Sequence, residues 1–227
     1  MYTPIPKCGW TTWMVVFFDH YKVYHDGNTG WAWSAPYDKI NFKITSLECS
    51  KEFLDYEYRL LFVRNPYERL VSGYKNKVLE KNGLYIKTYN KPCPWLTLDP
   101  KYNQTSLTFS QFVSCILETA RGQSTDLSSR KAGILLDHHW APQVHLSLPC
   151  TAMYTHIGTY DHFADDANEM IRIHKFNATL KRINQTPKSL SRSLESWYKQ
   201  LSVEQLTQFS KSQTFTCPVK VNKLIAT

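Results

Sequence analysis

Long apolar runs are absent from this sequence of 227 residues. The longest near the N-terminus is the six-residue stretch from Trp13 to Phe18, and Asp19 and His20 follow it directly. A membrane-spanning helix needs about 20 consecutive apolar residues, so no segment is predicted to cross a bilayer. The N-terminus also lacks a basic stretch followed by a small-residue cleavage site, which is the pattern of a secretory signal peptide.

Cysteine pairs with metal-binding spacing are also missing. No CxxC pair occurs among the six cysteines, which argues against a zinc ribbon and against a thioredoxin-like redox site. The cysteines are Cys8, Cys49, Cys93, Cys115, Cys150 and Cys217. There is no GxxxxGK[ST] phosphate loop, no signature of a common nucleic-acid-binding module and no internal repeat.

What the sequence does contain is enough apolar material for a packed core and an excess of positive charge. Hydrophobic residues make up 42% and aromatics 14%, and the length fits one domain or two small ones. Lys and Arg outnumber Asp and Glu by 27 to 19, giving a formal charge of +8. This excess favours an anionic partner: a phosphorylated nucleotide, an acidic glycan, an anionic membrane or a nucleic acid. Because the basic residues are dispersed, a nucleic-acid-binding module is the least favoured of these.

Strand and helix patterns alternate in the first half of the chain, which predicts an α/β fold with a parallel sheet. Leu60 to Val63 is a continuous apolar run, typical of a strand buried on both faces. Further strands are expected at 2–5 and 154–159, and helices after Thr11 or Thr12, after Ser50, from Pro66, after Thr108, over 161–175 and after Ser202. Residues 81–106 and 122–130 are expected to form loops.

Two segments carry the residues suited to chemistry. In the first, Lys7 and Gly9 lie in a strand-to-helix turn, where glycine and helix-terminal amides can surround a phosphate. Lys7 can neutralise the charge that develops on a leaving group. In the second, Arg64 ends the buried strand and Ser72 lies two helical turns later, on the same side as Arg69. A guanidinium with a hydroxyl suits a terminal phosphate, although either arginine could instead pair with a neighbouring acid.

Together these segments resemble the carbohydrate sulfotransferase family that includes the chondroitin 4-O- and HNK-1-type enzymes. Residues 6–13 are similar to the family's PKxGxTxW loop, and residues 62–77 to its FVRxPxxRLVSxYxxK segment. Residues 139–150 are similar to its HWxPQ…PC block, and residues 154–160 to the strand that follows. The matches keep their order over residues 4–209.

The resemblance implies a single domain over residues 1–227 with a P-loop-like sulfotransferase fold, a central parallel sheet flanked by helices. It implies transfer of a sulfuryl group from 3′-phosphoadenosine-5′-phosphosulfate (PAPS) to a glycan hydroxyl, with an acidic glycosaminoglycan such as chondroitin among the candidate acceptors. Lys7 would be catalytic, and neither a metal nor a nucleic acid would be needed. The expected nucleotide contacts are Pro6, Lys7, Cys8, Gly9, Trp10, Thr11, Thr12, Arg64, Asn65, Arg69 and Ser72.

A general base must take the proton of the acceptor hydroxyl, and His139 is the candidate because imidazole titrates near neutrality. His138 is an alternative, and Asp137 could serve as the base or orient a histidine. His139 could equally pack beside Trp140 for structural reasons. Acceptor choice is expected to depend on residues 81–106 and 122–138, which contain several basic residues.

The resemblance also implies a Golgi-lumenal enzyme with an N-terminal membrane anchor and stem. Because the first loop begins at residue 6, we expect these parts to be missing from this chain, either as a fragment or in a truncated relative. Asn-x-Thr sequons at Asn103, Asn177 and Asn184 are compatible with a lumenal glycoprotein.

Some positions depart from the family pattern and leave a second interpretation open, a catalytically impaired relative that binds nucleotide or glycan. Trp10 and Thr12 stand where the family usually has Cys and Asn, Asn65 replaces an Asp, and Ser147 replaces a Cys. The tail after Phe209 does not resemble the family's closing segment. A third interpretation is a basic nucleic-acid-binding module.

Overall fold

Within the part of the chain that the structure describes, a three-stranded parallel sheet lies at the centre, with strand order β1–β2–β3. The strands are β1 (Tyr2–Thr3), β2 (Leu60–Val63) and β3 (His156–Thr159). Leu60 pairs with Tyr2 on one side and with His156 on the other, so β2 is the central strand. Leu60, Leu61 and Phe62 are buried, as their continuous apolar pattern predicts. The predicted parallel α/β arrangement is therefore confirmed.

The computed structural model describes residues 2–22, 56–79, 107–121, 137–147, 149, 153–181 and 193–213. Expectations for the helix after Ser50 and for the loops at 81–106 and 122–130 lie outside these residues. No helix within these ranges is long and apolar enough to cross a membrane.

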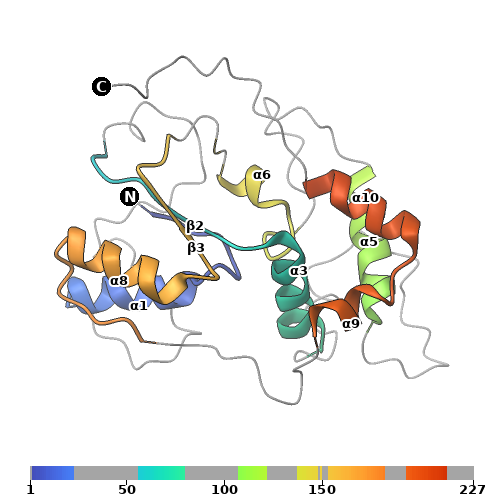
Figure 1. Ribbon diagram of the computed structural model, residues 1–227, viewed down its shortest axis with the longest axis horizontal. Coiled ribbons are helices and arrows are strands. Elements are labelled where there is room, and N and C mark those ends of the chain that lie inside the picture. The colour runs from blue at the N-terminus through green and yellow to red at the C-terminus, as the bar shows by residue number, and fades with distance from the viewer. Residues whose placement is uncertain are drawn as a thin grey trace.

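One apolar cluster joins the sheet to helices α1 (Trp10–His20) and α8 (Phe163–Ile173), which lie together on one side of Figure 1. Trp13 is fully buried at its centre, with ring centroids 5.7 Å from Tyr2 and 5.3 Å from Phe62. Met170 of α8 completes the contact with the strands. Because α1 is anchored in this way, the loop at its N-terminus has a fixed place at the end of the sheet.

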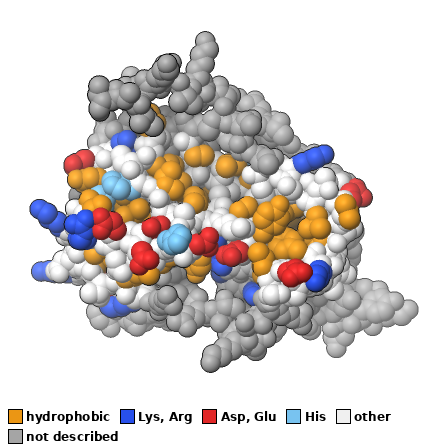
Figure 2. Space-filling view, in the orientation of Figure 1, with side chains coloured by type: hydrophobic (Ala, Val, Ile, Leu, Met, Phe, Trp, Pro, Cys, Tyr) orange, Lys and Arg blue, Asp and Glu red, His pale blue; other side chains and the backbone are white. Residues whose placement is uncertain are grey.

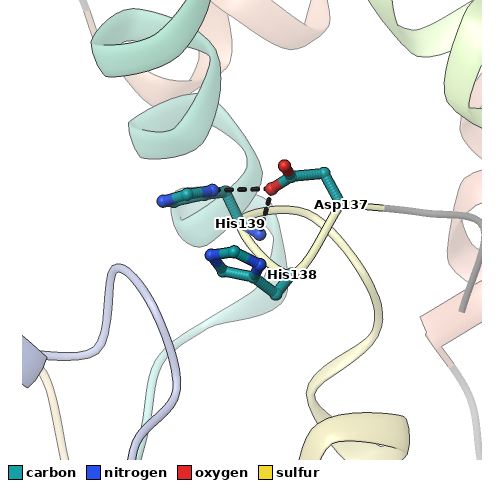
Figure 3. Close-up of side chains that lie close together, drawn as sticks. All are labelled: Asp137, His138 and His139. Carbon is teal, nitrogen blue, oxygen red and sulfur yellow. Dashed lines mark hydrogen bonds and ion pairs between the residues drawn. The ribbon is translucent and has the colours of Figure 1, made fainter. Parts of the chain in front are cut away.

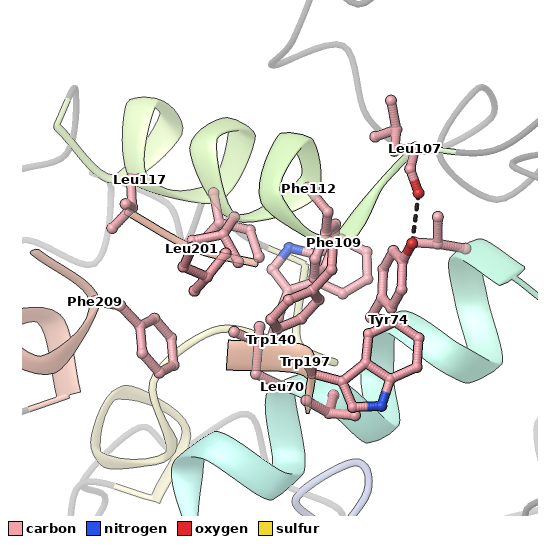
Figure 4. Packing of buried hydrophobic residues seen from close by; sticks show 14 of the residues in the cluster. Leu70, Tyr74, Leu107, Phe109, Phe112, Leu117, Trp140, Trp197, Leu201 and Phe209 are labelled. Carbon is pink, nitrogen blue, oxygen red and sulfur yellow. Dashed lines mark hydrogen bonds between the residues drawn. The ribbon is translucent and has the colours of Figure 1, made fainter. Parts of the chain in front are cut away.

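A second cluster lies at the other end of the molecule, among α3 (Pro66–Tyr74), α5 (Phe109–Arg121), α9 (Leu194–Tyr198) and α10 (Val203–Gln213). Figure 4 shows its aromatic rings meeting between the helices, where Tyr74 also donates a 2.6 Å hydrogen bond to the carbonyl oxygen of Leu107. Leu146 of α6 (Gln143–Ser147) packs against both clusters. Helix α6 therefore connects the two ends of the protein.

The helix boundaries follow capping signals. Thr108 and Gln111 form a reciprocal capping box, with Gln111 N–H donating to Thr108 Oγ1 and Thr108 N–H to Gln111 Oε1. Ser202 and Gln205 repeat this arrangement before α10. These predicted helix starts are confirmed.

Other boundaries differ from the sequence prediction. Helix α1 begins at Trp10 with Gly9 as its N-cap, so the expected cap at Thr11 or Thr12 is wrong. The reason is the turn before the helix, which requires a left-handed residue at position 9. The helix that begins at Pro66 continues beyond Tyr74 as a π-helical turn, η3 (Lys75–Leu79).

Candidate active site

The loop between β1 and α1 is a tight turn with two residues in the left-handed conformation. Lys7 has a φ of 70° and Gly9 a φ of 85°, and the amide of Cys8 donates to the carbonyl oxygen of Ile5 at 3.2 Å. A Cβ at Gly9 would lie 2.1 Å from Phe163 Cε2, so a side chain has no room there. Left-handed residues before a helix N-terminus turn successive amides toward one concave side, which suits an anion.

The other residues of this loop have different degrees of exposure. Lys7 and Thr11 are half-buried, whereas Cys8 and Thr12 are buried. Trp10 is also half-buried and packs against the cluster of the sheet and α1. The indole, at the position where the family usually has Cys, is therefore accommodated by apolar contacts with this cluster.

Arg64 brings the second sequence segment to this loop. It follows the last residue of β2, and its Nη1 donates to the carbonyl oxygen of Lys7 at 3.3 Å. Its Nε donates to Glu68 at 3.2 Å, and its guanidinium carbon lies 4.1 Å from the ring centroid of Tyr160. The side chain is only 17% exposed. The two predicted segments, 57 residues apart, therefore meet at one end of the sheet.

Arg69, a further expected nucleotide contact, is directed at the main chain of the protein itself. It is 2% exposed, and its guanidinium donates to three main-chain carbonyls: Pro6 at 3.0 Å, Ala141 at 2.7 Å and His138 at 2.7 Å. Burial lowers the pKa of Arg69 to about 10, so it stays charged at neutral pH. Its donors are used within the protein, and the side chain joins three segments behind the loop.

Asn65 and Ser72 are the last two residues that the sequence predicts to contact the nucleotide. The exposed Asn65 caps α3, accepting hydrogen bonds from the amides of Tyr67 and Glu68. Ser72 is half-buried on the same helix, and its hydroxyl makes no hydrogen bond to any other described residue. Asn65 thus has a local structural task, whereas no contact within the described residues assigns one to the Ser72 hydroxyl.

Asp137 and His139 form a close pair in the turn before α6. His139 Nδ1 lies 2.6 Å from Asp137 Oδ1, and the same oxygen accepts the His139 amide at 2.8 Å (Figure 3). His139 is 4% exposed, and burial lowers its pKa to about 4 although Asp137 acts in the opposite direction. The imidazole is therefore neutral at pH 7. With its Nδ1 proton directed at the carboxylate, Nε2 is the basic nitrogen.

His138 is the exposed ring of the same turn. Its ring centroid lies 4.3 Å from that of His139, and its carbonyl oxygen binds Arg69. Asp137, His138 and His139 have possible metal-ligand atoms within 4.8 Å of one another. Because Asp137 Oδ1 already accepts two hydrogen bonds from His139, an oriented imidazole explains the arrangement without a metal ion.

Two residues of the site match the family's segments in the sequence but had no expected role there. Tyr160 faces the guanidinium of Arg64, and Gln143 hydrogen-bonds to both Arg64 and Cys8. The motifs mark both positions, but they do not show what the side chains contact, because the partners of Gln143 lie 79 and 135 residues away in the sequence.

Comparison with known proteins gives one consistent family. The human carbohydrate sulfotransferase 14 is 25% identical over 160 residues, which is 67% of this chain and 36% of that protein. The human carbohydrate sulfotransferase 9 is 22% identical over 187 residues, covering 76% of this chain and 38% of the relative. The chain thus spans well under half the length of these curated relatives. No solved structure matches it significantly.

The sequence model of the sulfotransferase family matches nearly the whole chain, residues 1–215. This match includes the loop at Lys7, the Arg64 segment and the turn with His139. The chain therefore belongs to the sulfotransferase family, with carbohydrate sulfotransferases as its curated relatives.

Proposed function

We propose that this chain binds PAPS and transfers its sulfuryl group to a hydroxyl of a glycan. The observation that carries the proposal is the 3.3 Å hydrogen bond from Arg64 Nη1 to the carbonyl oxygen of Lys7. It brings the expected 5′-phosphosulfate loop and the expected 3′-phosphate arginine into contact. The names of the relatives, all carbohydrate sulfotransferases, support a glycan as acceptor.

The residues expected to contact PAPS have separate tasks. The left-handed turn at Lys7 and Gly9 suits the phosphosulfate, and Arg64 with the Ser72 hydroxyl suits the 3′-phosphate. In the reaction, the acceptor oxygen forms a bond to sulfur while the bond from sulfur to the bridging phosphate oxygen breaks. Lys7 supplies positive charge to that oxygen, so that 3′,5′-phosphoadenosine (PAP) leaves as a stabilised anion.

His139 is the proposed general base. The bond to Asp137 orients its ring with Nε2 unprotonated at neutral pH, and the carboxylate can stabilise the imidazolium that forms when Nε2 takes the proton of the acceptor hydroxyl. His138, exposed in the same turn, is the competing candidate. Replacing each histidine by Ala and measuring transfer separates them: loss in His139→Ala with activity kept in His138→Ala supports His139.

The test of the function is transfer of labelled sulfate from PAPS to a panel of desulfated glycosaminoglycans and neutral oligosaccharides. We expect transfer to at least one of them, with acidic acceptors favoured because of the net charge of +8. The second interpretation, a catalytically impaired relative, instead predicts that calorimetry detects PAP binding while no glycan receives sulfate. Absence of both binding and transfer would overturn the proposal.

A nucleic-acid-binding role has less support. Figure 2 shows basic, acidic and apolar side chains mixed over the described part of one face, without a continuous basic stripe there. Affinity for random DNA or RNA that falls steeply with salt would favour that role.

A Golgi-lumenal location is part of the same proposal. Asn177, the first residue of an Asn-Ala-Thr sequon, is exposed, and Cys115 is disulfide-bonded, as suits an oxidising compartment. The amide of Asn177 donates to His20 at the C-terminal end of α1, about 16 Å along that helix from Gly9. When the chain is expressed through the secretory pathway, we expect a glycosidase-sensitive mass that Asn177→Gln reduces, with PAP binding unchanged.

A further inference from the structure

Gln143 is the first residue of α6, and its side-chain amide makes hydrogen bonds to two distant segments. Its Nε2 donates to the carbonyl oxygen of Arg64 at 2.6 Å, and its Oε1 accepts the amide of Arg64 at 2.9 Å. The same Oε1 accepts a hydrogen bond from the thiol of Cys8 at 3.1 Å. The partners lie 79 and 135 residues away in sequence.

The bonds to Arg64 replace a missing strand neighbour. Val63 is the last residue of β2 that pairs with β3, through Thr159, so Arg64 has left the ladder. A primary amide presents one donor and one acceptor side by side, as a peptide group does. Gln143 therefore holds the main chain of Arg64 as a further strand would, while Glu68 and Tyr160 hold its guanidinium.

The bond to Cys8 extends this hold to the phosphosulfate loop. Cys8 is 0% exposed, and burial raises the pKa of its thiol to about 11, so the thiol keeps its proton and donates it. One oxygen atom thus joins the residue after Lys7 to the main chain of Arg64. Together with the bond from Arg64 Nη1 to the carbonyl oxygen of Lys7, this amide links the loop to the arginine.

We propose that Gln143 is a positioning residue of the nucleotide site, which holds Arg64 against the Cys8 loop and thereby determines recognition of the 3′-phosphate. This inference rests on the proposed function, because it assigns Gln143 a task at the proposed PAPS site. Gln143 acts through Arg64 and the loop, with no contact to the nucleotide required.

The test compares two ligands by calorimetry: PAP, and adenosine 5′-monophosphate, which lacks the 3′-phosphate. Gln143→Met keeps the size of the side chain and removes its hydrogen bonds. We expect the affinity for PAP to fall roughly tenfold or more, with a much smaller change for the monophosphate. In an Arg64→Ala background the same substitution should add little, since both act on one contact. Gln200→Met, at an exposed site, is the matched control.

Gln143→Glu gives a readout that a merely structural role does not predict. At neutral pH a carboxylate keeps the acceptor for Arg64 N–H and Cys8 but faces the Arg64 carbonyl oxygen without a donor. Protonation at lower pH restores that donor. The gap in PAP affinity between wild type and this variant should therefore narrow as the pH falls from 7.5 toward 5.

The results separate this inference from the proposed function. Equal losses for both nucleotides in Gln143→Met, or no loss in a folded variant, overturn the inference while wild-type PAP binding upholds the function. A wild type that does not prefer PAP overturns the function instead. Hydrogen exchange tests the bond between the Arg64 amide and Gln143 directly. The Arg64 amide should lose protection from exchange in Gln143→Met, and retained protection overturns the inference in every case.

Discussion

The Nε of Arg69 donates a 3.0 Å hydrogen bond to the carbonyl oxygen of Pro6, 63 residues earlier in the chain. The same guanidinium binds the carbonyl oxygens of His138 and Ala141, so one buried cation joins α3 to the loop between β1 and α1 and to the turn with His139. The planar fork of arginine allows these three bonds at once, which an ammonium group cannot reproduce in the same directions. The relative placement of the proposed catalytic residues therefore depends on a residue that we expect not to contact the nucleotide.

Arg69→Ala should destabilise the protein strongly. The change leaves three buried carbonyl oxygens without their donor, and we expect the free energy of unfolding to fall by about 3–5 kcal/mol. Urea unfolding followed by circular dichroism measures this. Arg172→Ala, which removes an exposed pair with Glu169, is the control and should leave the urea midpoint nearly unchanged. A small loss in Arg69→Ala would show that the three contacts contribute little.

Gly9→Ala should distort the loop, because the site excludes a methyl group in two ways. The φ of 85° is unfavourable for alanine, and the new Cβ would lie 2.1 Å from Phe163 Cε2. We expect a loss of about 2–4 kcal/mol in unfolding free energy together with weaker PAP binding. Adding Phe163→Leu should recover the part that comes from the clash and leave the conformational part. No recovery in the double variant would contradict the steric explanation.

Local signals in the sequence were sufficient for most of the regular elements. The apolar run of β2, Pro66 at the start of α3 and the capping box at Thr108 each depend on neighbours a few residues away, and each is confirmed. The five-residue helices α6 and α9 were not predicted, since so short a segment carries little periodicity.

The candidate site could be predicted only in part. The sequence indicated that the segments of Lys7 and Arg64 carry related chemistry, and their contact agrees with that. For Arg69, an expected nucleotide contact, the motif shows which residue is present and not which partners its donors meet in the folded protein. The carbonyl groups that bind Arg69, and the amide of Gln143 that holds Arg64, come from segments 63–79 residues away. Tertiary packing decides such contacts.

The buried His139 should make the protein sensitive to acid. Its pKa in the folded state is about 4, below the value of 6.5 for a free imidazole, so between these values the unfolded chain binds a proton that the folded chain does not. Stability is therefore present above pH 6.5 and is lost as the pH falls toward 4. Between pH 7.5 and 5 this residue should contribute a loss of about 2 kcal/mol. Urea unfolding at both pH values, for wild type and His139→Gln, measures the contribution as the difference in their pH dependence. An identical dependence in both proteins would exclude His139 as the cause.

Lys7 and Arg64 should affect different kinetic constants, because they are proposed to meet different charges. Lys7 faces charge that appears only as the sulfate leaves, so Lys7→Ala should lower kcat roughly 100-fold or more while the KM for PAPS changes little. Arg64 is proposed to hold a phosphate that is charged throughout, so Arg64→Ala should mainly raise the KM for PAPS and the Kd for PAP. Lys199→Ala, which removes an exposed pair with Glu195, should leave kcat, the KM for PAPS and the Kd for PAP unchanged. Steady-state transfer assays with calorimetry give all of these values. If Lys7→Ala raises only the KM for PAPS and leaves kcat intact, Lys7 belongs to the binding site and another group must stabilise the leaving oxygen.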